Sequence, residues 1–352
     1  MIECPTKPLH DALSLARHVT LRNSTIPAYA MVMLQARPEN AWLTMTAAGT
    51  DCQIALDVEA DIEEPLAVCV DADRMALALA SPGEKSKLSI DKDGRLKIVT
   101  GRSVFRLPAS PAEDLPLLLS QGDKIAAFEC AWLADSLKRV LPFTGTTDAV
   151  RIYVGGVSFS GGDEGVRMNV TTGHVAASLL VPGKIEPFRR MLPRRVCDVL
   201  ASTAPTRAIV KPATAVFLGE NVQITCAYLA AEMPDVTRAI QSKPLIEVDR
   251  KEFIETVKTI SALSDVQLKS YWVVRLGAIG GELTIEAMTM SGEGRATIPC
   301  SDVVWEDHFD AGYLVALASS VGGEKLSLLS NGKGHLGVAE PGFWATVVGQ
   351  RV

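Results

Sequence analysis

The sequence predicts an α+β fold in which three similar domains each pack two helices on antiparallel sheet. Two short markers recur in the same order along the 352-residue chain. The first, an apolar–Glu–apolar step before a helix-like segment, stands at Ile2–Cys4, Phe128–Cys130 and Ile246–Val248. The second, Leu-Ala-Ser at the end of another helical pattern, stands at 79–81, 200–202 and 317–319. Both recur every 117 to 126 residues, and a third of the chain is about 117, so three repeats are predicted.

The first helix of each repeat is predicted from apolar residues spaced three or four positions apart, which place one apolar stripe on a helix. These residues are Leu9, Leu13 and Ala16 in the first repeat, Leu133, Leu137, Val140 and Leu141 in the second, and Phe253, Val257 and Ile260 in the third. The second helix of each repeat is expected to end at the Leu-Ala-Ser marker.

Alternation of apolar and polar residues predicts half-buried strands at 41–46, 166–171 and 282–287. A hairpin is predicted over 88–99, because Asp93-Gly94 lies between two apolar runs. Polar or proline-containing stretches near 116–124 and 240–246 are the expected domain boundaries. The domains are therefore expected at 1–120, 121–243 and 244–352.

The composition favours an ordinary globular protein, with 47% hydrophobic and 22% charged residues. No apolar run reaches the ~18 residues typical of a membrane span, and the N-terminus lacks the basic start and apolar core of a signal peptide. A cytoplasmic protein without a membrane partner is expected. The net charge of −6 argues against a surface coated in basic residues, although one basic surface within an acidic protein remains open.

The seven cysteines are scattered, without a CxxC pair, so neither a metal site nor a disulfide framework is expected. They are expected to be buried, reduced side chains. No catalytic group is predicted either. His174 lacks a nucleophile motif, the acidic pairs at 63–64 and 306–307 lack metal-ligand spacing, and the glycines at 277–281 and 322–323 lack the strand–loop–helix frame of a nucleotide site. A non-catalytic protein without a cofactor is expected.

The threefold repeat, together with several short segments in order, resembles the β subunit of bacterial DNA polymerase III, the sliding clamp. The segments are Thr25–Pro27, Ala48–Asp51, Gly101–Leu107, Pro111–Pro116, Val150–Gly156, Thr171–His174 and Met233–Asp235 followed by Arg238. The resemblance implies that three domains form half of a six-domain ring, and that two protomers join head to tail. It also implies that helices line the hole, that double-stranded DNA is encircled without sequence reading, and that a polymerase is tethered.

If the helices face the hole, the residues opposite their apolar stripes should face DNA. These are Lys7 and His18, Lys138, Lys251 and Lys258 on the first helices, and Arg194, with Arg74 and Arg195 on a flank, on the second helices. Arg22 lies in a loop near a place where the family contacts DNA, although the family's arginine aligns closer to Asn23. The alternative, equally open here, is that these are ordinary solvated charges.

The resemblance also implies a cleft that holds short peptide motifs of polymerases and clamp loaders. The matching residues are Val154, Thr171, Gly173, His174, Val175, Pro234, Arg238, Tyr271, Tyr313, Val347, Val348 and Arg351. For any single valine or tyrosine, simple core packing is the alternative. Val175 replaces the family's usual arginine, and the end of the chain, 347–352, differs from the family's Met-Pro-Met-type tail. A functional but shallower and less polar cleft is therefore expected.

Phe105 and Leu107 match apolar interface residues on a domain 1 edge strand of the family, and their counterparts would be Ala262 and Leu263. The alternative is that Phe105 and Leu107 fill the core of their own domain. Three functions remain open from the sequence. They are a working replicative clamp, a diverged clamp paralogue that serves one specialised partner or inhibits the main clamp, and an unrelated enzyme on a triplicated scaffold.

Overall fold

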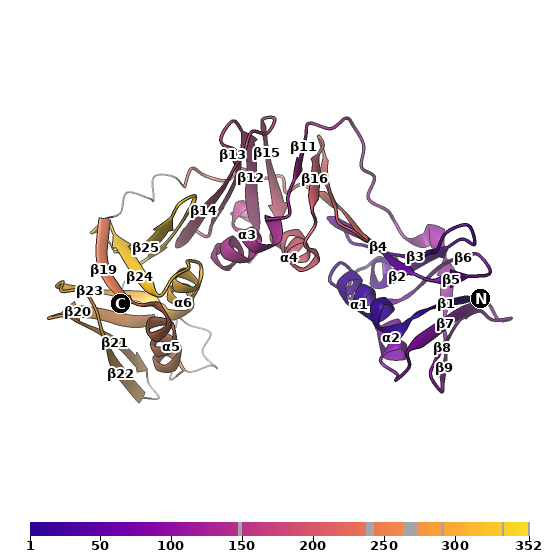
Figure 1. Ribbon diagram of the computed structural model, residues 1–352, viewed down its shortest axis with the longest axis horizontal. Coiled ribbons are helices and arrows are strands. Elements are labelled where there is room, and N and C mark those ends of the chain that lie inside the picture. Colours follow the sequence, from indigo (N-terminus) through magenta and orange to yellow (C-terminus); the bar gives the residue numbers. More distant parts are fainter. Residues whose placement is uncertain (147–149, 237–242, 263–272, 290–291, 333, 351–352) are drawn as a thin grey trace. The chain divides into compact units, whose positions relative to one another are not determined.

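The computed structural model describes residues 1–146, 150–236, 243–262, 273–289, 292–332 and 334–350 (Figure 1). The chain divides into two compact units. Unit 1 combines Met1–Leu137 with Arg195–Tyr228, and unit 2 combines Lys138–Arg194 with Leu229–Val352. The division runs through the middle third of the sequence, so the three domain boundaries expected above stay a prediction.

Unit 1 is built on a nine-stranded antiparallel sheet that runs from the first repeat into the middle one. In spatial order its strands are β10 (Ala109–Pro111), β6 (Leu66–Asp71), β2 (Met31–Ala36), β3 (Trp42–Ala48), β4 (Cys52–Glu59), β18 (Val222–Ala227), β17 (Thr214–Leu218), β16 (Arg207–Val210) and β11 (Ala126–Glu129). The pairing of β4 with β18 is the joint between the two repeats. We call it joint 1.

A second, five-stranded sheet of unit 1 contains the predicted hairpin. Its order is β5 (Asp61–Ile62), β1 (Ile2–Pro5), β7 (Lys85–Ile90), β8 (Leu96–Thr100) and β9 (Ser103–Leu107). Gly94 adopts φ +74° in the turn between β7 and β8, a conformation that favours glycine. The hairpin expected from Asp93-Gly94 is confirmed. Strand β9 is an edge of this sheet.

Unit 2 contains an eight-stranded antiparallel sheet that joins the middle repeat to the last one. Its order is β15 (Phe188–Pro193), β12 (Gly156–Gly162), β13 (Gly165–Thr171), β14 (Val175–Pro182), β26 (Phe343–Val348), β25 (His335–Glu340), β24 (Lys325–Ser330) and β19 (Lys243–Asp249). Its joint is the pairing of β14 with β26, which we call joint 2. A four-stranded sheet follows, in the order β22 (Gly292–Pro299), β21 (Glu282–Thr289), β20 (Val273–Ile279) and β23 (Trp305–Asp310).

Six α-helices lie in the described part of the chain. They are α1 (Thr6–Arg17), α2 (Ala72–Leu79), α3 (Leu133–Val140), α4 (Arg194–Thr203), α5 (Arg250–Ser261) and α6 (Ala311–Ser319). Helices α1 and α2 pack side by side in unit 1, as α5 and α6 do in unit 2 (Figure 1). The predicted apolar stripes are buried, and the Leu-Ala-Ser markers fall at the ends of α2, α4 and α6, so the predicted helices are confirmed.

One helix end differs from its prediction. Leu141 was expected to continue the apolar stripe of α3, but α3 ends at Val140 and Leu141–Phe143 form a 3-10 turn. Pro142 explains the change, because proline has no N–H to donate and disfavours the α conformation in the residue before it. Leu141 nevertheless remains buried.

The two joints use the same strand register. In joint 1, Val222, the first residue of β18, pairs with Leu56, the fifth residue of β4. In joint 2, Phe343, the first residue of β26, pairs with Leu179, the fifth residue of β14. The repeated sequence therefore produces a repeated way of joining neighbours.

Candidate functional site

A cavity of about 230 Å³ in unit 2 coincides with much of the predicted cleft. Its lining residues are Tyr153, Thr171, Gly173, His174, Val175, Ala176, Pro234, Asp235, Val236, His335, Thr346 and Val348. Six of the predicted residues, Thr171, Gly173, His174, Val175, Pro234 and Val348, are therefore brought together here. The cavity lies against joint 2, because Val175 pairs with Val347 and Ala176 with Thr346 across β14 and β26.

Hydrogen bonds within 171–175 fix the turn that forms one wall of the cavity. The Thr171 hydroxyl donates to the carbonyl of Val175 at 2.7 Å and accepts from the Gly173 N–H at 3.0 Å. Gly173 adopts φ +91°, where a side chain would be strained. The Val348 N–H donates to the carbonyl of His174 at 2.8 Å. The end of β26 is thus tied to this turn.

Other predicted cleft residues lie elsewhere. Val154 and Val347 are buried and do not line the cavity. Tyr313 lies in the first turn of α6, where its N–H donates to Asp310 Oδ1, and it does not line the cavity either. Arg238, Tyr271 and Arg351 lie outside the described residues.

Sequence reasoning missed six lining residues: Tyr153, Ala176, Asp235, Val236, His335 and Thr346. A period of two could have found one of them, because Thr346 and Val348 alternate along β26. His335 can be assigned to the cavity only from the pairing of β25 with β26, which sets it opposite Val348. That pairing is invisible in a single sequence.

A larger cavity of about 910 Å³ in unit 2 has a different character. Arg275 lies 2.7 Å from Glu286 and 2.6 Å from Glu306, and Arg295 lies 3.2 Å from Glu286. Arg275 lowers the pKa of Glu306 through its hydrogen bond, which keeps this carboxyl ionised. Three charged residues of this lining, Arg275, Glu286 and Arg295, pair with one another, so we regard the smaller, more apolar cavity as the candidate for binding a peptide.

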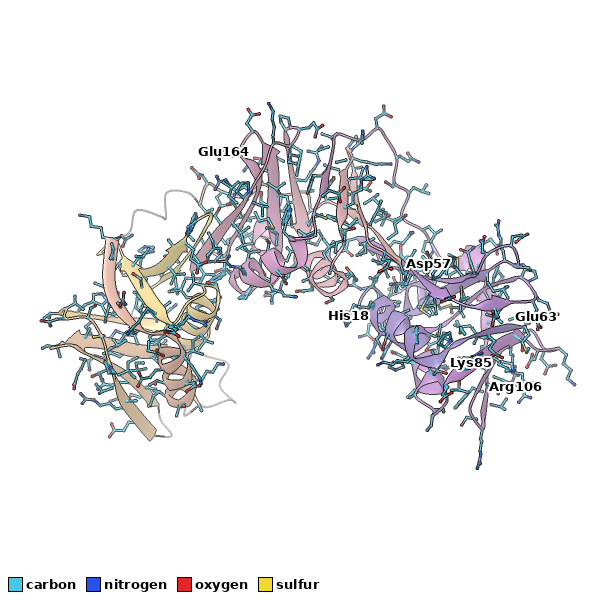
Figure 2. The ribbon with its side chains drawn as sticks, in the orientation of Figure 1. His18, Asp57, Glu63, Lys85, Arg106 and Glu164 are labelled. Atoms are coloured by element: carbon cyan, nitrogen blue, oxygen red, sulfur yellow. The ribbon has the colours of Figure 1, made fainter. Side chains whose placement is uncertain are left out.

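The predicted DNA-facing lysines are exposed on three different helices. Lys7 lies on α1, Lys138 on α3, and Lys251 and Lys258 on α5. Lys251 also lies 3.9 Å from Glu255, one turn along its helix. His18 is exposed at the end of α1 (Figure 2). Their contact with DNA stays a prediction.

Three of the four predicted DNA-facing arginines, Arg22, Arg194 and Arg195, have side-chain partners within the protein. Arg22 lies 2.9 Å from Asp73, which also pairs with Arg17 at 2.7 Å. The Arg194 guanidinium donates to the carbonyl of Thr144 at 2.6 Å. Arg74 is exposed on α2. The sequence could not reveal these partners, because they lie far away along the chain.

Arg195 strengthens joint 1. Its Nη2 donates to three carbonyls at the C-terminal end of α1. These are the carbonyls of His18 at 3.2 Å, of Thr20 at 3.1 Å and of Val19. Arg139 strengthens joint 2 in the same way, since its Nε donates at 2.8 Å to the carbonyl of Ser320, which caps α6. A cation near a helix C-terminus is stabilised by the unpaired carbonyls and the helix dipole. Each joint therefore combines strand pairing with an arginine.

The predicted interface residues lie on and near sheet edges. Phe105 and Leu107 are half-buried on the edge strand β9. Ala262 is the exposed C-cap residue of α5, which packs against β21 and the edge strand β22. Leu263 lies outside the described residues.

Six cysteines are buried and Cys300 is partly buried. Burial raises the pKa of Cys4, Cys52 and Cys130 to about 12, so these groups are protonated thiols at neutral pH. Among the described residues, no cluster of His, Cys, Asp or Glu has the arrangement of a metal site. No described helix is long and apolar enough to cross a membrane.

Comparisons with known proteins show which family this chain resembles. Residues 1–119 match the model of the DNA polymerase III beta subunit, N-terminal domain. The beta sliding clamp of Caulobacter vibrioides is 25% identical over 342 residues, covering 90% of this chain and 89% of that protein. That of Synechocystis is 23% identical over 293 residues, covering 74% and 75%.

Solved structures extend the likeness to the whole chain. A C. crescentus beta sliding clamp has a TM-score of 0.84 at 22% identity, covering 100% of this chain and 99% of that one. A Helicobacter pylori beta clamp, solved bound to a DNA ligase peptide, has a TM-score of 0.85 at 14% identity and covers 100% of both chains. The predicted clamp-type fold is therefore confirmed.

Proposed function

We propose that this chain, which belongs to the sliding-clamp family of DNA polymerase III beta subunits, is a processivity clamp without catalytic activity. Two copies join head to tail around duplex DNA, and short peptide motifs of a polymerase and of clamp-loader subunits bind the clefts. The comparisons do not favour the alternative of a specialised or inhibitory paralogue. The observation that carries the proposal is the repeated joint, which points to a third joint between copies.

Each repeat supplies one strand of each kind used in a joint. Strands β4, β14 and β22 are each the last strand of a three-strand meander, namely β2-β3-β4, β12-β13-β14 and β20-β21-β22. Strands β18, β26 and β9 each end a later hairpin. Joints 1 and 2 pair β4 with β18 and β14 with β26. Within the described chain, β22 and β9 are sheet edges. Pairing β22 of one copy with β9 of another would cover both edges and close a ring at two such joints.

The register of joints 1 and 2 supports specific contacts in this third joint. The first residue of β9, Ser103, would pair with the fifth residue of β22, Ala296. The same register sets Phe105 opposite Gly294, which has no side chain and leaves room for the ring. It sets Arg106 opposite Glu293, an attractive pair on the exposed face (Arg106 is labelled in Figure 2).

The inner surface of such a ring should bind DNA weakly. Exposed lysines on α1, α3 and α5 support contacts with phosphates, which carry no sequence information. A clamp needs such loose contacts, because its attachment is topological and it must slide. The net charge of −6 fits a protein that does not grip nucleic acid over its whole surface.

The cleft supports binding of a short extended peptide. It combines apolar residues such as Val175 and Val348 with polar groups such as His174 and Asp235, a mixture that can hold an apolar anchor and orient a backbone. Val175 pairs with Val347 in joint 2, so the residue that replaces the family's arginine is buried in the strand ladder. This supports a less polar cleft.

Loading onto DNA tests the proposal. Light scattering should give a particle of twice the 37.6 kDa chain mass. With its cognate clamp loader, the protein should stay on nicked circular plasmid after gel filtration in high salt and should slide off once the plasmid is linearised. Phe105→Asp is expected to give a monomer that is not retained, whereas Val348→Asp should leave the dimer intact and weaken peptide binding. A monomeric wild-type protein, or equal retention on linear and circular DNA, would contradict the proposal.

A further inference from the structure

Three cysteines from separate parts of the chain meet beneath joint 1. Cys52 lies on β4, Cys226 on β18 and Cys197 on α4, and all three are buried. They lie close enough that Cys52 and Cys197 both raise the pKa of Cys226 by charge repulsion, in addition to the larger effect of burial. Neither the cleft nor the edge strands use these thiols.

Cys52 and Cys226 are direct cross-strand partners. The Ala227 N–H donates to the carbonyl of Asp51 at 2.9 Å, so the neighbouring pair of residues is the hydrogen-bonded one. Because antiparallel pairs alternate, the cysteines occupy a non-hydrogen-bonded position, where Cα atoms approach to about 4.5 Å and side chains share a face. That separation lies within the range of about 4.4–6.8 Å found for disulfides. Cys197 reaches the cluster from a helix and lacks this relation.

We propose that Cys52 and Cys226 are a latent disulfide site, which closes joint 1 covalently under a disulfide oxidant such as oxidised glutathione. The Cys52 thiolate attacks one sulfur of oxidised glutathione and releases one glutathione. The Cys226 thiolate then attacks the Cys52 sulfur of the mixed disulfide and releases the second glutathione. Two protein thiols are oxidised, one glutathione disulfide is reduced, and the two thiol protons leave with the two glutathione molecules.

The burial of both thiols sets how the site reacts. Burial holds them as protonated thiols, and only the thiolate is an effective nucleophile. Oxidation therefore proceeds when β4 and β18 separate locally and admit water and oxidant. Arg195 bridges the same joint through its hydrogen bonds to the end of α1, so it makes this local separation of the strands less frequent.

The disulfide would fix the first repeat to the middle one by a bond between residues 52 and 226. A cross-link that spans so much chain restricts the unfolded state and raises stability. It touches neither β9, β22 nor the cleft. The dimer mass and the affinity for a clamp-binding peptide should thus be unchanged, which separates a failure of this inference from a failure of the proposed clamp function.

Oxidation of the intact protein tests the site. The wild-type protein is incubated with oxidised glutathione, with and without urea below the unfolding midpoint, then alkylated, digested without reduction and mapped by mass spectrometry. The expected product is a Cys52–Cys226 peptide, two hydrogens lighter than the free pair. It should form several-fold faster in urea and raise Tm by several degrees. Cys197→Ala should give the same product, and Cys52→Ala should give neither the link nor the Tm rise.

Other results would overturn the inference. They are a dominant link that includes Cys197, glutathione mixed disulfides that never resolve to the Cys52–Cys226 link, or a rate of oxidation that urea leaves unchanged. Because the mapping uses the wild-type chain, it gives an answer even if an alanine variant folds poorly.

Discussion

Replacing Arg195 with alanine tests whether this residue stabilises joint 1 or contacts DNA. One guanidinium donates to the carbonyls of His18, Val19 and Thr20 and is about one third exposed. A hydrogen bond that involves a charged group contributes about 1.5–3 kcal/mol, and a cation at a helix C-terminus about 0.3–1 kcal/mol. The three carbonyls share one cation and regain water after its removal, so we expect a total loss of about 2–3 kcal/mol rather than three full bonds.

The assay is urea and thermal unfolding of Arg195→Ala, with Arg37→Ala as an exposed control arginine in the same unit. The variant should unfold about 4–10 °C lower, and the control should match the wild type. Arg195→Lys should recover only part of the loss, because an ammonium cannot span several carbonyls. Unchanged stability together with a weaker, less salt-sensitive binding to DNA would refute the assignment of Arg195 to the joint.

Three further outcomes follow from the described geometry. Gly173→Ala should weaken binding of a clamp-type peptide several-fold in calorimetry with little loss of dimer, because φ +91° is unfavourable for alanine. An unchanged peptide affinity would show that the turn does not shape the cleft. Arg106→Glu and Glu293→Arg should each weaken the dimer, measured by analytical ultracentrifugation, and the variant that carries both changes should restore it. A double variant that dimerises no better than the single variants would exclude the pairing of Arg106 with Glu293. Lys85 lowers the pKa of Glu3, so the stabilising charge is fully present above the ordinary glutamate pKa of about 4.5 and is lost as the pH falls through the lowered pKa of the folded state. Glu3→Gln should accordingly destabilise at pH 7, and its difference in stability from the wild type should shrink as the pH falls below about 4.5.

The repeat could be predicted from the sequence because local patterns encode it. Apolar spacing located α1, α3 and α5, and Asp93-Gly94 located a hairpin, since each depends on neighbours within a few residues. The end of α3 was missed because the local restriction imposed by Pro142 outweighed the apolar period. Proline is itself a local signal, so this error could have been avoided.

The cleft was only half predictable, for a physical reason. Thr171, Gly173 and His174 form one turn and could be matched as a segment. His335 and Thr346 reach the same cavity through strand pairing across the sheet, and no spacing along the chain encodes that proximity. The arginines were misleading for a similar reason. A helical wheel shows which direction a charge faces, but it cannot show that the carbonyls at the end of α1 lie within reach of Arg195.

Assigning Arg195 to the joint leaves the lysines as the main candidates for contact with DNA. Lys7, Lys138, Lys251 and Lys258 are exposed, and a dimer would present two copies of each. Each neutralised phosphate contributes about −0.9 to the slope of log affinity against log salt, so this set permits a slope no steeper than about −7.

Replacing all four lysines with glutamine should flatten that slope for binding to linear duplex, measured by fluorescence anisotropy at several salt concentrations. The loaded ring should nevertheless remain on nicked circular plasmid in high salt, because in the proposed clamp retention depends on closure at β9 and β22 and not on ion pairs. The four positions are exposed, so the fold should tolerate the change, which equal Tm values would verify. If the quadruple variant loaded normally and then left circular DNA as readily as linear DNA, attachment would be ionic and the topological mechanism would be wrong.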